Sequence, residues 1–143
     1  MKNYFENAQS IYDTLVKKLE NYGVSSREMP ELRSTVGLLP YYDRDTREIY
    51  VPHFDRRIPS GRAQITLLRV LLGCQTDNEL LEALDAMTPW LIAHELAHHL
   101  RNQHGTMSND LWFEEQIANM FALALAKYLI GMNRTGFSGG SNL

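Results

Sequence analysis

Near the start of the chain, apolar residues recur every three or four positions, which is the spacing of a helix with one buried face. The stripe comprises Tyr4, Ala8, Ile11, Tyr12, Leu15, Leu19 and Tyr22. Gly23 follows, and glycine commonly ends a helix because it adopts positive φ without strain. Residues 24–35 show no clear period, and Pro30 is unfavourable for a central strand there. We therefore predict one amphipathic helix followed by an irregular segment.

Residues 37–54 have the pattern of a β-hairpin. Two runs rich in aromatic and β-branched residues, 38–42 and 49–51, flank a turn-forming segment at 43–46. A loop is expected from Phe54 to Gly61, because this segment contains Pro59 as well as the glycine. The hairpin should therefore supply the small sheet of the fold.

Four further helices are predicted after this loop. The first covers Arg62–Leu72 and ends at Gly73. Thr76 and Glu79 form a capping box that begins the second. In the third, Thr88 is the expected N-cap, Pro89 is the first helical residue, and the end lies near His104 and Gly105. The last runs from Leu111 to Ile130, with Asn109 or Asp110 as its cap and Gly131 at its end.

These elements predict a helix-rich α+β fold with a small sheet built on a hairpin. A length of 143 residues suits one domain, expected over residues 1–132, followed by a flexible Gly- and Ser-rich tail at 133–143. The net charge of −3 is made of interspersed charges without a basic block, so no nucleic-acid partner is expected. Cys74 is the only cysteine, which rules out a disulfide within the chain.

The chain shows no targeting signal for a membrane or for export. Polar residues interrupt the first seven positions, where a signal peptide needs a continuous apolar run. No stretch approaches about 18 consecutive apolar residues, the length of a transmembrane helix. A cytoplasmic location without a membrane partner is therefore the expectation.

The segment His94-Glu95-Leu96-Ala97-His98 contains candidate metal ligands and a candidate catalytic base. Residues four apart on a helix lie about 40° apart around the axis and about 6 Å along it, so the two imidazoles can converge on one ion. Zinc accepts histidine nitrogen, and Glu95 stands beside the pair as a base for water activated by the metal. Paired histidines at this spacing also occur on ordinary helix surfaces, but here they fall on a well-capped helix.

The other residues of this helix suggest how it is oriented. Ala93, Leu96, Ala97 and Leu100 form an apolar stripe that should face the core. The solvent side is expected to hold Glu95, His99, Asn102 and Gln103. The histidine pair would then lie on the border between the two faces, half sheltered and half open to a substrate.

Catalytic zinc usually has three protein ligands and one open position, so a third ligand is needed. Glu115 is the preferred candidate because it falls within an apolar stripe of the last helix, where a buried carboxylate needs a partner. Asn119, one turn later, would hydrogen-bond the free ring nitrogen of His94. Glu114 is expected to be an exposed acid of the first helical turn. The competitor is His104, but a continuing helix would carry it about 240° around from His98.

With these residues in place, the chain resembles the ImmA/IrrE-like metallopeptidases (the DUF955 group), which are gluzincins. Residues 91–100 are similar to that family's motif helix, residues 115–122 to its segment with the third ligand, and residues 41–51 to the preceding hairpin. The segment 62–88 between hairpin and motif is longer than is typical, and no helix-turn-helix module accompanies the domain. The resemblance implies a zincin-like domain that hydrolyses a polypeptide, often a transcriptional repressor.

The hypothesis is therefore a zinc metallopeptidase with one Zn²⁺ per chain held by His94, His98 and Glu115. Zinc would lower the pKa of water in the fourth position, and Glu95 would take the proton and pass it to the leaving amine. An alternative is a non-hydrolytic regulatory or protein-binding module on a degenerate peptidase fold, although the intact Glu95 weighs against it. Candidates for stabilising an oxyanion lie on or beside the hairpin: Tyr41, Tyr42, Tyr50 and His53.

Overall fold

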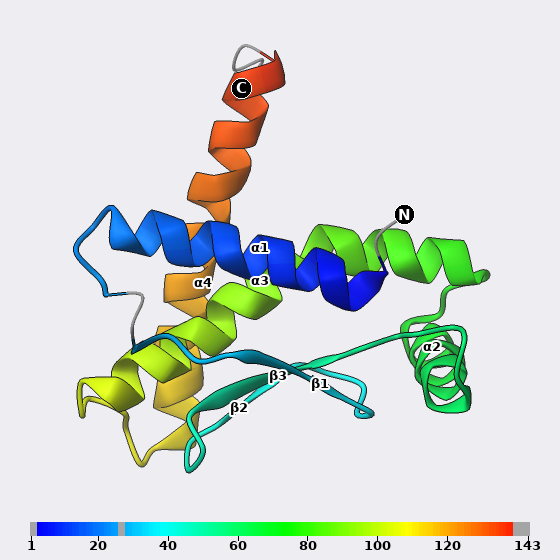
Figure 1. Cartoon of the computed structure of the whole chain (residues 1–143), viewed down its shortest axis with the longest axis horizontal. Helices are drawn as coiled ribbons and strands as arrows, with labels where there is room; N and C mark the ends of the chain where they lie inside the picture. Colours follow the sequence, from blue (N-terminus) through cyan, green and yellow to red (C-terminus); the bar gives the residue numbers. More distant parts are fainter. Residues whose placement is uncertain (1–2, 26–27, 139–143) are drawn as a thin grey trace.

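The computed structural model describes residues 3–25 and 28–138, and these form four helices and a three-stranded sheet (Figure 1). The helices are α1 (Tyr4–Glu20), α2 (Pro59–Leu72), α3 (Asp77–Gln103) and α4 (Leu111–Ser138). The strands are β1 (Leu32–Thr35), β2 (Tyr41–Asp43) and β3 (Glu48–Pro52). The predicted helix-rich α+β single domain is therefore confirmed.

Helix α1 buries the face that the apolar spacing predicts. Its buried residues are Tyr4, Ala8, Tyr12, Leu15 and Leu19, whereas Tyr22 lies beyond the helix and is exposed. At the start, the side chain of Asn3 accepts a hydrogen bond from the Glu6 N–H, and the Glu6 carboxylate accepts one from the Asn3 N–H. At the other end the chain turns at Gly23, whose φ is 88°. Capping and burial thus act together to place α1 against the core.

The sheet contains the predicted hairpin and one strand that the pattern did not predict. Strands β2 and β3 pair antiparallel, with Tyr42 opposite Ile49. Strand β1 pairs with β3 in parallel, giving the order β1-β3-β2. It escaped prediction because it is four residues long and buries only Leu32 fully. Its edge position agrees with the location of Pro30 just before it.

Helix α2 begins earlier than expected, at Pro59, because proline suits the first helical position. The segment 54–61 is therefore a loop only in its first part. Gly61 lies so close to the loop that an added Cβ would stand 1.8 Å from the backbone oxygen of Asp55. The helix ends as predicted at Gly73, which has φ of 72°. Close backbone packing thus joins the loop after β3 to α2.

Helix α3 is one continuous helix, so the predicted break at Thr88 and Pro89 is wrong. Proline removes one backbone N–H and normally ends or kinks a helix. Here the Thr88 side chain is fully buried, and its hydroxyl bonds both the Leu84 carbonyl and the Tyr4 hydroxyl. Thr88 therefore serves as an interior contact to α1 instead of a cap, and packing holds the helix through the proline.

Helix α4 begins where the sequence indicates but continues further than predicted. The side chain of Asp110 accepts a hydrogen bond from the Phe113 N–H at 3.2 Å, which confirms it as the cap. Gly131 does not end the helix, which runs on to Ser138. The last part of the expected tail, residues 139–143, lies outside the described residues. In Figure 1 the C-terminal half of α4 extends away from the other elements.

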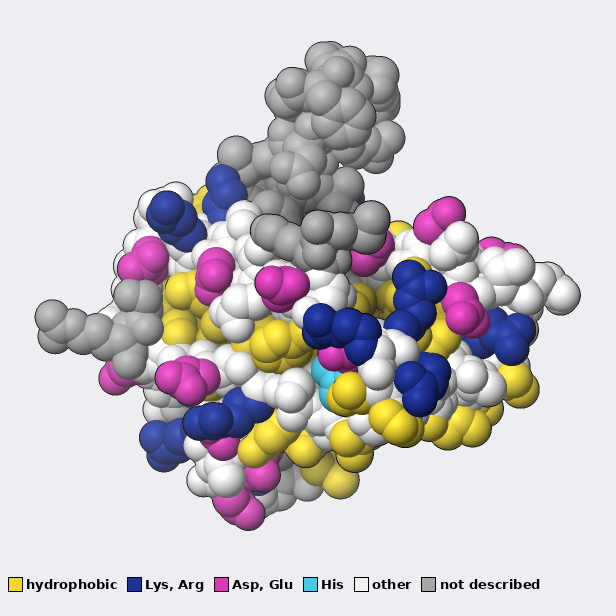
Figure 2. All heavy atoms as spheres, turned by 45° about the vertical axis from the view of Figure 1, so that its right-hand side comes forward, with side chains coloured by type: hydrophobic (Ala, Val, Ile, Leu, Met, Phe, Trp, Pro, Cys, Tyr) yellow, Lys and Arg dark blue, Asp and Glu magenta, His cyan; other side chains and the backbone are white. Residues whose placement is uncertain are grey.

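The core lies between α1, the sheet and α3, and α2 covers one end of it. Large apolar side chains remain exposed on α2, among them Leu67, Val70 and Leu71. Figure 2 shows hydrophobic and basic side chains close together on the side of the molecule that includes this helix. Within the described ranges, no helix is long and apolar enough to cross a bilayer.

Candidate metal centre

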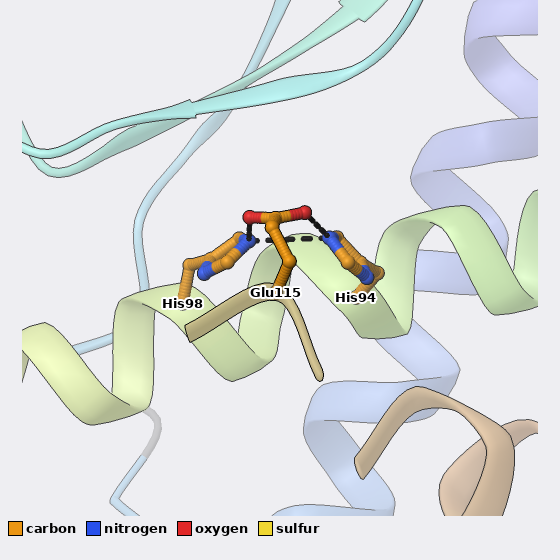
Figure 3. A group of neighbouring side chains, drawn as sticks. All are labelled: His94, His98 and Glu115. Atoms are coloured by element: carbon orange, nitrogen blue, oxygen red, sulfur yellow. Dashed lines mark hydrogen bonds and ion pairs between the residues drawn. The ribbon is translucent and has the colours of Figure 1, made fainter. Parts of the chain in front are cut away.

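Three side chains meet where the first turn of α4 passes the motif turn of α3 (Figure 3). The Nε2 atoms of His94 and His98 are 3.1 Å apart. One carboxylate oxygen of Glu115 lies 3.0 Å from Nε2 of His94, and the other lies 2.9 Å from Nε2 of His98. Within the described part of the chain, these three residues form the only group of three or more His, Cys, Asp and Glu side chains that could hold a metal ion. Both predicted histidines and the preferred third candidate are therefore brought together.

The spacing of these atoms suits a small cation. Ligand atoms at about 2.0–2.1 Å from a tetrahedral ion stand roughly 3.3 Å from one another. The observed separations of 2.9–3.1 Å are slightly shorter than that value. Two imidazole lone pairs and a carboxylate repel one another unless a proton or a cation lies among them. The donor set therefore fits a bound metal ion, which would need only a small outward shift of the ligands.

The two neighbouring acids of α4, Glu114 and Glu115, have environments opposite to those that the sequence predicted. The Glu115 side chain is 54% exposed, although its carboxylate reaches the histidines. The Glu114 side chain, expected in solvent, is 4% exposed. The reason is the direction from which α4 approaches α3: Glu114 points into the contact between the two helices and Glu115 points to its rim. The expectation of a buried Glu115 and an exposed Glu114 was therefore wrong.

Glu114 is held by several hydrogen bonds at this contact. Nε of Arg101 lies 2.9 Å from both carboxylate oxygens, and the N–H of Ser108 donates to Oε1 at 2.9 Å. Burial alone would raise the pKa of the Glu114 carboxyl, but the Ser108 and Arg101 hydrogen bonds outweigh it and the pKa lies below its usual value. Its Oε2 also lies 3.5 Å from Nδ1 of His98. A charged carboxylate thus stands behind one of the candidate ligands.

The face of α3 that was expected in solvent is largely covered. Glu95 and His99 are buried, and Asn102 and Gln103 are half-buried. Strand β2 and Glu28 lie over this face, which the helix periodicity alone could not show. This covering places the Glu95 carboxyl in a sheltered position next to the candidate ligands.

Hydrogen bonds fix this covering layer to α3. The Asn102 amide donates to the Tyr42 hydroxyl at 3.1 Å. Nε2 of His99 donates to the Glu28 carbonyl at 2.7 Å. In the neutral ring Nδ1 therefore accepts the proton of the Tyr42 hydroxyl, at 3.0 Å. Burial lowers the pKa of His99, in agreement with a neutral ring. Sequence reasoning missed this network, although the spacing of Glu95, His99 and Asn102 along one face could have indicated a second packed surface.

The acid–base properties of the motif follow from its burial. Burial raises the pKa of Glu95 to about 8, and the nearby Glu115 carboxylate adds to this, whereas a backbone hydrogen bond from Tyr42 acts in the opposite direction. Burial also lowers the pKa of His98, more than the Glu115 carboxylate raises it. A neutral His98 has a free lone pair, which is the form that binds a metal. Without a metal, the site therefore favours a neutral imidazole ligand beside a protonated Glu95 carboxyl group at neutral pH.

Two other predictions for this site have different outcomes. The hydrogen bond expected from Asn119 to His94 is not formed, since the buried Nδ1 of His94 has no partner among the residues that the structure describes. His104 is the C-cap of α3 and does not belong to the group of possible ligands, as expected for a helix that continues past Arg101. The ring of Trp90, which was not predicted, lies 5.3 Å from the ring of His94 and shields that side of the site.

The four candidates for stabilising an oxyanion have other contacts. The Tyr42 hydroxyl belongs to the network with His99, and the Tyr50 hydroxyl donates to Glu48 at 3.2 Å. Tyr41 stacks on Tyr50 with ring centroids 4.8 Å apart. His53 accepts a hydrogen bond from the Asp55 N–H through Nδ1 and contacts the Ser60 hydroxyl through Nε2. These contacts agree with packing roles for the four side chains.

No family model, curated protein or solved structure matches the chain. Its function is therefore inferred from the residues of this site and from their geometry.

Proposed function

We propose that the chain is a zinc metallopeptidase of the ImmA/IrrE-like type. The observation that supports this most is the convergence of His94, His98 and Glu115, with Glu95 buried beside them. Two nitrogens and one oxygen are the ligand set of many catalytic zinc sites. The resemblance of the motif helix and of the segment after Glu115 to that family supports the same reading.

Zinc in such a site would supply Lewis acidity, which activates water and polarises a carbonyl group. The chain itself would supply the proton transfer. Glu95 is sheltered from bulk solvent and lies near the ligand atoms, so its carboxylate can accept a proton from water and deliver it to a leaving nitrogen. A cation at the three ligands would favour the ionised form of this carboxyl. Without the cation, burial and the neighbouring Glu115 carboxylate disfavour that form.

Glu95→Gln tests this proposal directly. The amide occupies nearly the same volume but cannot accept the proton, so the variant should keep zinc and lose peptide hydrolysis by about 100-fold or more. Glu82→Gln is a matched control, because Glu82 is an exposed glutamate on the same helix. A mixture of unfolded polypeptides serves as substrate, with cleavage followed by mass spectrometry.

Two results would decide against the proposal. One is full hydrolytic activity in Glu95→Gln, which would remove Glu95 from the mechanism. The other is wild-type protein that holds zinc yet cleaves none of the polypeptides, which is what a binding module on a degenerate peptidase fold would show.

A further inference from the structure

Helix α2 presents large aliphatic side chains on the side that does not pack against the core. The residues of α2 that are buried in the fold are Gly61, Gln64, Ile65 and Leu68. On the opposite side Leu67, Val70 and Leu71 are 55%, 68% and 69% exposed. With 3.6 residues per turn, these three side chains lie within about 100° of one another around the helix axis. They form a continuous apolar stripe, here called the outer face of α2, and exposed apolar patches commonly mark an interaction surface.

Positive charge is concentrated in the same part of the chain. The whole chain has 17 acidic and 14 basic residues, whereas residues 56–76 contain four arginines and no Asp or Glu. Two of these arginines pair with neighbouring aspartates, Asp55 and Asp77. The other two, Arg56 and Arg62, are exposed and have no carboxylate partner among the described residues; Nη1 of Arg62 donates to the Arg56 carbonyl instead. Two guanidinium groups without a counter-charge therefore lie next to the outer face.

We propose that the outer face of α2, together with Arg56 and Arg62, docks the protein on the surface of an anionic lipid bilayer. The aliphatic side chains enter the boundary between headgroups and acyl chains, and the guanidinium groups contact acidic headgroups. A helix bound in this way lies in the plane of the bilayer and needs no transmembrane span. The expectation of no membrane partner was based on signal peptides and long apolar runs, and neither is required for this kind of contact.

The chemistry of the outer face favours lipid over a protein partner. Its apolar residues are all Leu and Val, which are under-represented among the side chains that dominate protein interfaces. In Figure 1 α2 lies at an edge of the molecule, where a flat surface can reach it. Ile58 and Leu72 are also exposed and extend the aliphatic surface at the two ends of the helix. A second copy of α2 would bring arginines against arginines, so the charge disfavours self-association through this face.

Vesicle sedimentation with the full chain tests the proposal. One set of vesicles contains only phosphatidylcholine, and the other also contains about 30 mol% phosphatidylserine, whose negative surface potential attracts arginine. The partition coefficient of the wild type should be at least about 10-fold higher on the anionic vesicles. It should fall as salt is added, because the attraction between surface charges is screened.

The double variant Leu67→Ser with Leu71→Ser removes the apolar part of the contact. Its partition coefficient on anionic vesicles should be at least about 10-fold lower than that of the wild type, because two fewer aliphatic side chains leave water. Met120→Ser with Leu123→Ser is the matched control, since these two residues are exposed to a similar extent on α4. The control should bind as the wild type does.

The double variant Arg56→Gln with Arg62→Gln removes the charged part. Binding to anionic vesicles should fall about 10-fold, and binding to neutral vesicles should not change. Lys17→Gln with Arg44→Gln is the control, because it changes the net charge by the same amount at exposed positions on α1 and in the turn between β2 and β3. That control should stay within about threefold of the wild type, as expected for charges that lie away from the bilayer.

Failure of the wild type to bind anionic vesicles at low salt overturns the proposal, and so does equal binding to both kinds of vesicle. A loss in either control as large as in its test variant also overturns it, since the contact would then not be made by α2. Sedimentation velocity without vesicles covers the remaining occupant: a wild-type dimer that Leu67→Ser with Leu71→Ser converts to a monomer would assign the outer face to a second copy. None of these measurements depends on zinc, so their failure leaves the proposed peptidase unaffected.

Discussion

Oε2 of Glu115 lies 2.9 Å from Nε2 of His98, although the two residues belong to different helices and Glu115 is mostly exposed. The contact depends on the short connection between α3 and α4. Gly105 has φ of 69°, which reverses the chain after α3, and Asp110 caps the return. The first turn of α4 is thereby brought back beside the motif turn. A side chain at the rim of this contact can complete a metal centre and leave one side open.

Replacing Glu115 should weaken zinc binding much more than replacing His104. In Glu115→Ala the two histidines remain but the only anionic ligand is lost, so we expect the affinity for Zn²⁺ to fall by at least about 100-fold. His104→Ala should bind zinc as the wild type does, because His104 is the C-cap of α3 and does not belong to the group of possible ligands. Chelator competition with each purified protein measures the difference. Loss of affinity in His104→Ala with none in Glu115→Ala would refute this assignment of the third ligand.

Asp55 should make the stability of the protein depend on acid pH. Hydrogen bonds from the Arg57 side chain, and a further one from its backbone, lower the pKa of Asp55 to about 2, below its usual value near 3.8. On acidification the unfolded chain therefore takes up this proton first, so the stability from the pair is present above pH 4 and is lost as the pH falls towards 2. Thermal unfolding at pH 5 and pH 2.5 should show a smaller acid-induced decrease in Asp55→Asn.

Asp45→Asn is the control for that experiment, because Asp45 is an exposed turn residue to which the structure, in its described part, assigns no salt bridge. It removes the same charge and should lose as much stability on acidification as the wild type. Equal acid sensitivity of all three proteins would show that the contact between Asp55 and Arg57 does not persist in solution.

Gly61 should tolerate no side chain. A Cβ there would lie 1.8 Å from the carbonyl oxygen of Asp55 and 2.6 Å from its nitrogen, and backbone atoms cannot rotate away. We expect Gly61→Ala to lower the free energy of unfolding by about 3 kcal/mol or more, at the upper end of overpacking effects. In Gly37→Ala the new Cβ would meet only the Thr35 side chain, at 3.8 Å, so the change should stay within about 0.5 kcal/mol. Urea unfolding of both variants compares them, and similar midpoints would contradict the close packing of the loop.

The spacing of residues along the sequence predicted those elements that depend only on residues close together in the chain. The apolar stripe of α1, the hairpin of β2 and β3, the glycine that ends α2 and the two histidines of the motif all follow from periods of two or 3.6 residues and from turn chemistry. Glu115 was also selected as a ligand, although the burial on which that selection relied is wrong, since its side chain is 54% exposed. Sequence alone thus determined the class of the fold and the three residues of the candidate metal centre.

Tertiary packing decided whether a helix continues and which of its polar side chains are buried. Thr88 and Pro89 have the local character of a helix start, but the contact of Thr88 with Tyr4 places them inside α3. Glu114 and Glu115 are neighbours of the same chemical type, and only the direction of approach of α4 decides which is buried. Likewise Glu95 becomes sheltered because β2 lies over α3. Burial and acid–base properties depend on elements far apart in the chain, and helix periodicity carries no information about which of them will meet.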